Sequence, residues 1–192
     1  MHSKIYLQVL VVAIAFFTSL VFGAPGEIEF AIESSEKRVN FAVPEEMIPT
    51  NISPPKESVS SALLVLDPKA LGGKGEYYVN LVPFRSPELL ENMQKKNLVE
   101  SIEQGSIYSG YRMYQRYDNP VFGFILVGST SGGRQVFLKC AAKINPYTKC
   151  TYYGAISGVI SYELIFPESQ IATLDKLVEL AVLKINKIMR KD

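Results

Sequence analysis

The stretch that decides the fold of this chain is "KCTYYGAISGVISYELIF", residues 149 to 166. Residues 149 to 155 and 159 to 166 are rich in Tyr, Val, Ile and Phe, which favour β-strands. The intervening "ISG" has the small and flexible residues that turns prefer. The stretch therefore predicts two antiparallel strands joined by a tight turn.

Three further strands are predicted immediately before this pair. They are separated by "DNP", "STSGG" and "NPYT", all of which are typical of turns. Because each connection is short, neighbouring strands should pair in sequence order. The whole region then forms a meander of consecutive antiparallel strands, which begins with residues 107 to 117, 121 to 129 and 134 to 144.

The first half of the chain is more irregular. Residues 24 to 37 are polar and mixed, so we expect a loose segment there. A proline-rich connection covers residues 44 to 60, and Ser86-Pro87-Glu88 predicts the start of a helix that ends near residue 103. The predicted strands are residues 38 to 43, 62 to 66 and 76 to 84, the last two joined as a hairpin.

The chain closes with a predicted amphipathic helix of about five turns, with Ser169 as its N-cap. Its other face mixes acidic and basic residues, whereas a membrane-surface helix would have a strongly basic one. We therefore expect it to pack on a sheet. The apolar positions recur at intervals of three and four residues: Ile171, Leu174, Val178, Ala181, Ile185 and Ile188. The predicted fold class is α+β, an antiparallel β-sheet packed against helices.

The N-terminal segment "MHSKIYLQVLVVAIAFFTSLVFGAPG" is typical of a secretory signal peptide. Lys4 precedes an apolar core, and small residues allow cleavage after Gly23. The alternative is that this segment is not cleaved and remains as a transmembrane anchor, through which the protein would contact a membrane. We expect residues 1 to 23 to be removed and residues 24 to 192 to form one exported domain.

The charge, histidine and cysteine content indicate which partners, metal sites and covalent links to expect. Without Lys4, the 20 basic side chains fall to 19, which equals the 19 acidic ones, so a nucleic-acid partner is not expected. The only histidine is His2, inside the predicted signal peptide, so a transition-metal site lacks its commonest ligand. In an oxidising compartment Cys140 and Cys150 should form a disulfide, although free thiols or pairing between chains are alternatives.

Catalytic motifs are incomplete. Without histidine a Ser-His-Asp or Cys-His arrangement is excluded. The segment "GSTSGGR", residues 128 to 134, lacks the residues of a nucleophile elbow or a phosphate loop and predicts a hairpin turn. A hydrolase that uses Glu45, Glu46 or Glu163 is harder to exclude, but nothing in the sequence brings these carboxylates together. We expect neither a cofactor nor an enzymatic activity.

Tyrosine and arginine gather on one predicted strand. Arg112, Tyr114 and Arg116 alternate on one face, and Tyr147 lies at the tip of the "NPYT" turn. Tyr and Arg are enriched among the residues that anchor protein interfaces. The alternative is an ordinary half-exposed strand. We take these four residues as candidate partner-binding residues.

The C-terminal text "KCTYYGAISGVISYELIFPESQIATLDKLVELAVLKINKIM", residues 149 to 189, also carries a family resemblance. A cysteine on a strand, a glycine turn, a strand with spaced Tyr and Phe, and a closing helix that ends in Ile-Met resemble the periplasmic immunity proteins that guard bacteria against type VI secretion lipase effectors. The order of the preceding elements is similar to that domain and to PsbP-like α/β/α sandwiches. A tryptophan expected early in the helix is absent, and Leu174 stands near its place.

The resemblance implies an α/β/α sandwich in the periplasm that binds a cognate toxin and holds it inactive. The alternative class is a periplasmic carrier or accessory protein that holds a lipid or small ligand between sheet and helices. A toxin gene beside this one would favour the first reading. A large apolar cavity would favour the second.

Overall fold

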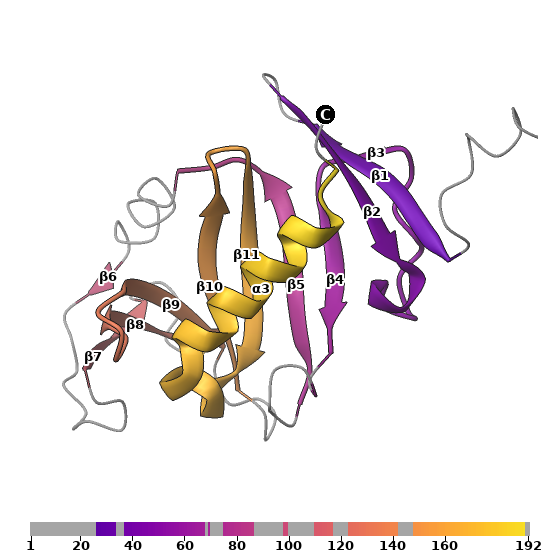
Figure 1. The fold of residues 1–192 in the computed structure, drawn as a ribbon. Coiled ribbons are helices and arrows are strands. Elements are labelled where there is room, and N and C mark those ends of the chain that lie inside the picture. The colour runs from indigo at the N-terminus through magenta and orange to yellow at the C-terminus, as the bar shows by residue number, and fades with distance from the viewer. Residues whose placement is uncertain are drawn as a thin grey trace, which may run out of the picture.

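The computed structural model describes residues 26–33, 37–67, 69, 75–86, 98–99, 110–116, 123–141 and 148–190. These residues form two β-sheets, one α-helix and two short 3-10 helices (Figure 1). The predicted signal peptide, residues 1 to 23, lies outside them. In chain order the elements are β1 Glu27–Glu33, β2 Arg38–Pro44, η2 Glu45–Met47, β3 Ser58–Val59, β4 Ala62–Leu66, β5 Tyr77–Pro83, β6 Leu98–Val99, β7 Tyr111–Arg116, β8 Gly123–Ser129, β9 Gln135–Ala141, β10 Lys149–Ile156, β11 Ile160–Pro167, η3 Glu168–Thr173 and α3 Leu174–Ile188.

The predicted α+β class, an α/β/α sandwich, is wrong, because the described chain is mainly β. In the described residues, α3 is the one α-helix and it covers one face of the larger sheet (Figure 1). Two local errors contributed. Residues 27–33 form a strand where we expected a loose segment, and Leu98–Val99 lies in a strand inside the segment predicted as a helix.

The larger sheet, called the large sheet below, has eight strands in the order β4-β5-β11-β10-β9-β8-β7-β6. Every neighbouring pair is antiparallel. The predicted β4–β5 hairpin and the predicted meander from β7 to β11 are confirmed. The pairing of β5 with β11 joins the two halves of the chain, and the Asn80 side chain bonds there to Glu163, 83 residues later.

The small sheet has the order β2-β1-β3. β1 is the strand that the sequence analysis missed, although "EIEFAIE" alternates Glu with apolar residues at the strand period. Its pairing with β2 places Phe30 opposite Phe41, and the two rings stack with centroids 5.4 Å apart. Both phenylalanines are buried in the same core cluster as α3 and the large sheet. The small sheet therefore belongs to the main core.

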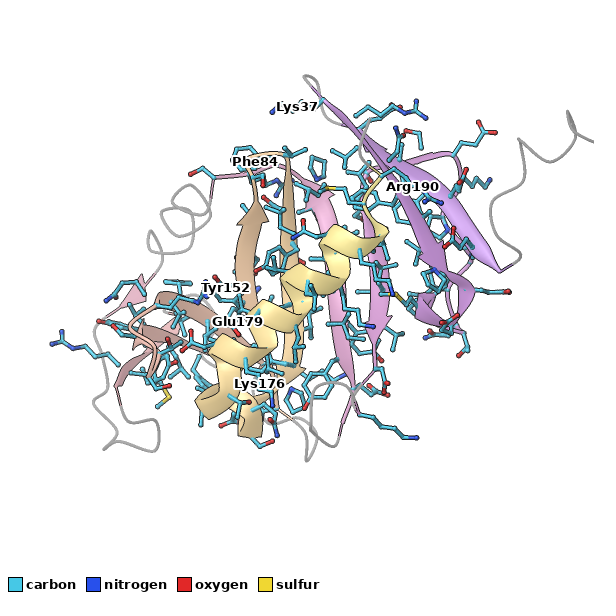
Figure 2. The ribbon with its side chains drawn as sticks, in the orientation of Figure 1. Lys37, Phe84, Tyr152, Lys176, Glu179 and Arg190 are labelled. Atoms are coloured by element: carbon cyan, nitrogen blue, oxygen red, sulfur yellow. A yellow bond between two sulfur atoms is a disulfide. The ribbon has the colours of Figure 1, made fainter. Side chains whose placement is uncertain are left out.

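α3 packs on the large sheet through the face that its periodicity predicted. Its outward side carries charged residues such as Lys176 and Glu179 (Figure 2). The predicted N-cap Ser169 is wrong, because η3 precedes a helix that begins only at Leu174. No helix among the described residues has both the length and the apolar character to cross a bilayer. The buried helix residues are Leu174, Leu177, Val178, Ala181, Ile185 and Ile188.

The "STSGG" segment joins the antiparallel strands β8 and β9, so it is a hairpin turn as predicted. Asp175, at the start of α3, bonds to this turn. The Thr130 hydroxyl donates to the Asp175 carboxylate, the Gly132 amide donates to it at 3.0 Å, and Arg134 pairs with it at 3.1 Å. The hydrogen bonds from Thr130 and Gly132, with Arg134, hold the pKa of Asp175 below its usual range. A Cβ at Gly132 would lie 2.7 Å from this carboxylate, so a larger residue would have to displace the Asp175 side chain.

The structure contains the Cys140–Cys150 disulfide. The two residues face each other directly across β9 and β10. Both are buried in the core cluster on the side that α3 covers. The bond therefore fixes the pairing of two central strands at the end opposite the Asp175 contacts.

We predict that Asp175→Asn lowers the free energy of unfolding by about 1 kcal/mol at pH 7, because it weakens charge-assisted hydrogen bonds at a partly exposed site. A lowered folded-state pKa gives stability that is present above the unfolded pKa, about 4, and is lost as pH falls through the folded value. The difference from the parent should therefore shrink below about pH 4. Denaturant titrations at pH 7 and at low pH measure it. Glu179→Gln, exposed on the same helix, should change little at either pH. A gap that persists unchanged at low pH would contradict the assignment.

We predict that replacing both Cys140 and Cys150 with Ala lowers stability by about 3 kcal/mol, the loop-closure value for a bridge of this span. The sequence separation is 10 residues. Chemical unfolding of the variant, compared with the parent with and without reductant, measures the effect. If the reduced parent is as stable as the oxidised one, the bond does not stabilise the fold.

Candidate protein-binding face

Strand alternation gives the large sheet two distinct faces. On β5, Tyr77, Val79 and Leu81 are fully buried on the side that α3 covers. The residues between them, including Tyr78 and Asn80, point to the opposite side and are half-buried. No described helix covers that opposite side. We call it the open face.

The open face carries apolar and polar side chains. The strand registers align them in rows that run across the sheet, and none of the half-buried apolar residues belongs to the core cluster. Polar residues such as Asn80, Thr151 and Glu163 stand in the same rows and divide the apolar residues into patches, and exposed apolar patches can mark an interaction site. The half-buried apolar residues of the open face are Leu63, Val65, Tyr78, Val82, Val127, Phe137, Tyr153 and Ile165.

Two of the four predicted partner-binding residues lie on the open face. On β7, Arg112 is exposed and Tyr114 is half-buried, while the alternate residues Tyr111 and Met113 pack against the core. Arg116 ends β7, where it pairs with Leu98 of β6. Tyr147 lies outside the described residues. The predicted division of this strand into two faces therefore agrees with the packing of Tyr111 and Met113.

The sequence analysis missed the neighbours of these residues on β8 and β9. Arg112 is aligned with Val127 and Phe137, and Tyr114 is aligned with Ile125 and Lys139. Gln135 and Lys139 are exposed, whereas the alternate residues Val136, Leu138 and Cys140 are buried. This alternation of outward and buried residues along β9 is the sequence pattern that could have identified Phe137 and Lys139 as candidates. It shows that Phe137 and Lys139 share the face opposite the disulfide.

Gly128 allows β7 to approach β8 closely. A Cβ at this position would lie 2.1 Å from the Gly110 carbonyl oxygen, a backbone atom that cannot move aside without shifting β7. Gly110 itself has a φ of 88°, a conformation that suits glycine. These two glycines therefore set where Arg112 and Tyr114 stand relative to the rest of the open face.

Charges on the β5–β10–β11 part of the open face are already paired. Lys149 forms an ion pair with Glu76 at 2.8 Å, and its ammonium group lies 4.8 Å from the centre of the Tyr78 ring. The hydrogen bond from Lys149 lowers the pKa of Glu76. Glu163 accepts a hydrogen bond from Asn80 at 2.9 Å. Glu163 thus has a structural partner rather than a catalytic one.

Arg112 and Lys139, by contrast, form no ion pair with a carboxylate in the described part of the chain. Both are exposed. The β7–β9 end of the open face therefore presents two cations without a described counter-charge. This end can attract negative charge in a way that the β5–β10–β11 part cannot.

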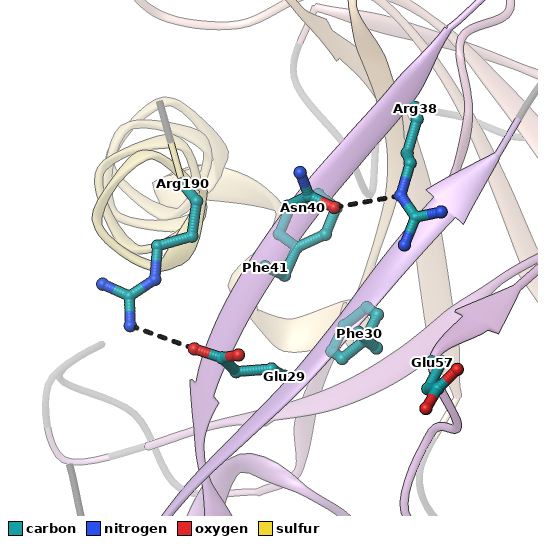
Figure 3. Close-up of a pocket in the computed structure, with 7 residues that line it drawn as sticks. All are labelled: Glu29, Phe30, Arg38, Asn40, Phe41, Glu57 and Arg190. Atoms are coloured by element: carbon teal, nitrogen blue, oxygen red, sulfur yellow. Dashed lines mark hydrogen bonds and ion pairs between the residues drawn. The ribbon is translucent and has the colours of Figure 1, made fainter. Parts of the chain in front are cut away.

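A pocket of about 400 Å³ lies on the small sheet (Figure 3). Both of its arginines are already paired: Arg190 bonds to Glu27 at 3.0 Å and lies 3.7 Å from Glu29, and Arg38 bonds to Glu33 at 2.8 Å. The pocket therefore offers little net charge to a ligand. The residues that line it are Glu29, Phe30, Arg38, Asn40, Phe41, Glu57 and Arg190.

The described residues contain no group of three or more His, Cys, Asp or Glu side chains that could hold a metal ion. Glu45 and Glu46 are exposed on η2, where they show no shared site with Glu163. The described surface offers apolar contact on the open face, and charge at its β7–β9 end.

No protein-family model and no curated protein sequence matches this chain. The fold, however, is similar to the solved structure of Smlt3025, an immunity protein of the Stenotrophomonas maltophilia type IV secretion system. The TM-score is 0.52 at 12% sequence identity, and the match covers 85% of this chain and 94% of that chain. The chain therefore has a fold similar to that of Smlt3025.

We predict that Gly128→Ala displaces β7 and lowers stability by about 1–3 kcal/mol, the usual effect of an added group at a tightly packed position. Amide hydrogen exchange should become faster in β7 than in β10 or β11, because β7 must move away from β8. Denaturant unfolding with exchange mass spectrometry measures both. Unchanged protection of β7 would show that the close approach does not position this strand.

Proposed function

We propose that this protein is an exported immunity protein, which neutralises a toxin by forming a protein–protein complex with it. The observation that carries the proposal is the immunity-protein-like fold over most of the chain. The C-terminal sequence resemblance led to the same class. The open face adds a reason of its own, since apolar patches that nothing described covers suit a binding protein.

The proposed compartment is the periplasm. The predicted signal peptide, cleaved after Gly23, would deliver residues 24 to 192 there as a single domain. The Cys140–Cys150 disulfide supports an oxidising location, where such bonds persist. A toxin that acts in the periplasm or on its membranes would meet the protein in the same space.

The two sources of the proposal name different secretion systems. The sequence resemblance is to immunity proteins against type VI lipase effectors, whereas Smlt3025 belongs to a type IV secretion system. We therefore define the partner by its site of action, as a toxin delivered into the periplasm. A type VI lipase effector is one member of that class.

The complex, and not catalysis, would supply the protective effect. The proposed anchors are Arg112, Tyr114, Arg116 and Tyr147. The alternative, a periplasmic carrier of a lipid or small ligand, has weaker support. Five of the seven residues that line the pocket on the small sheet are charged or polar, and only Phe30 and Phe41 are apolar, whereas a lipid would need a mainly apolar lining.

We predict that co-expression of this protein in the periplasm protects cells from the toxin encoded beside its own gene, and that the two proteins co-purify. Tyr114→Ala should weaken the purified complex by about 2 kcal/mol, or roughly thirtyfold in Kd, as loss of an interface anchor does. Calorimetric titration measures the affinity and growth measures the protection. Leu183→Ala, 65% exposed on the outward side of α3, is the matched control and should bind like the parent.

The proposal fails if the parent neither binds this toxin nor protects against it. It fails in favour of the carrier class if the purified protein instead retains a lipid through gel filtration. Protection without a stable complex would also contradict it.

A further inference from the structure

We propose that the toxin binds the β7–β9 end of the open face, and that its matching surface is an apolar patch flanked by carboxylates. This inference rests on the proposed function and adds a location and a partner chemistry to it. It is carried by six residues that the strand registers place in a compact grid. We call them the grid: Arg112, Tyr114, Ile125, Val127, Phe137 and Lys139.

The grid has three strands and two rows. One row is Arg112, Val127 and Phe137, and the other is Tyr114, Ile125 and Lys139. The two cations therefore occupy opposite corners, the two aromatic residues occupy the other corners, and the aliphatic residues stand between them. Strand spacing places the cations about 12 Å apart, across a patch of apolar side chains.

The composition of the grid is that of an interface centre. Aromatic residues and Arg carry most of the energy in protein interfaces. Val127 is half-buried and offers apolar surface between them, whereas Ile125 is only 3% exposed and supports the patch from beneath. The six residues alone are too small for a stable interface, which buries about 800 Å² per partner. Further contact area would come from β10 and β11, where Thr151 and Ile165 extend one row and Tyr153 is aligned with Glu163.

The charges of Arg112 and Lys139 indicate what kind of partner surface the grid would bind. Lys149 and Glu163, elsewhere on the open face, already have polar partners, whereas Arg112 and Lys139 have no carboxylate partner in the described chain. A partner with two carboxylates at matching corners would complete the two pairs. A nucleic acid or an anionic membrane would need a larger basic cluster, since lipid-binding clusters hold about 4–8 basic residues.

The first test is charge reversal. Arg112→Glu and Lys139→Glu should each weaken the toxin complex at least about tenfold, mainly through slower association, because the pairs lie at the rim of an apolar centre. The parent's association rate should fall as salt is raised, and the double variant should lose most of that dependence. Lys184→Glu, exposed on α3 and so outside the open face, is the matched control and should behave like the parent.

The second test reads the chemistry of the contact directly. A water-soluble carbodiimide joins a lysine amine to a carboxylate that touches it. In the complex, Lys139 should be linked to an Asp or Glu of the toxin, as peptide mass spectrometry would show. Lys139→Arg should keep the affinity, since the charge remains, and should lose the link, since a guanidinium does not react.

The outcomes separate the two proposals. If the toxin binds the parent and both reversed variants equally, or if cross-links form only through lysines of α3, the grid is wrong and the proposed function stands. If Lys139 links instead to a carboxylate of its own chain in the free protein, a segment of this chain occupies the grid and the inference is wrong. If the parent does not bind the toxin at all, the proposed function fails and this inference fails with it.

Discussion

In the described part of the chain a single α-helix covers one face of a wide sheet, and the rest of the described architecture follows from that constraint. α3 has 15 residues, so it is about 22 Å long, whereas eight strands span about 34 Å. The helix cannot cover both ends. The small sheet shields the β4 end, where Phe30 and Phe41 join the core, and Tyr111 and Met113 pack against the core from β7.

The same constraint leaves the two faces of the large sheet with different roles. The disulfide and the Asp175 contacts both lie on the side of α3, and they stabilise the fold there. The open face carries none of these bonds. A change of Arg112 or Lys139 should therefore alter what the protein binds more than whether it folds. That separation lets the surface diverge between related proteins while the core is kept.

The sequence predicted the parts of the fold that local chemistry determines. Turn residues and strand formers placed β4, β5 and the meander within a few residues of their observed bounds, and helical periodicity identified the buried face of α3. β1 was missed because the glutamates on its exposed side made the segment appear too polar for a strand. The α/β/α arrangement was wrong because layer order depends on long-range pairing. The binding candidates on β7 were found by composition, but Phe137 and Lys139 become their neighbours only through a register that no local pattern encodes.

The last described residues of the chain dock on one of its first strands. Met189 bridges to Phe41, and the Arg190 amide donates to the Asn40 carbonyl at 2.9 Å. Together with the pairing of β5 and β11, this gives the molecule a high contact order, which slows folding. The contacts that Met189 and Arg190 make with the small sheet can form only after α3 has been synthesised. If the chain crosses a membrane as an extended thread, as the proposed function requires, it cannot complete its fold until nearly all of it has emerged.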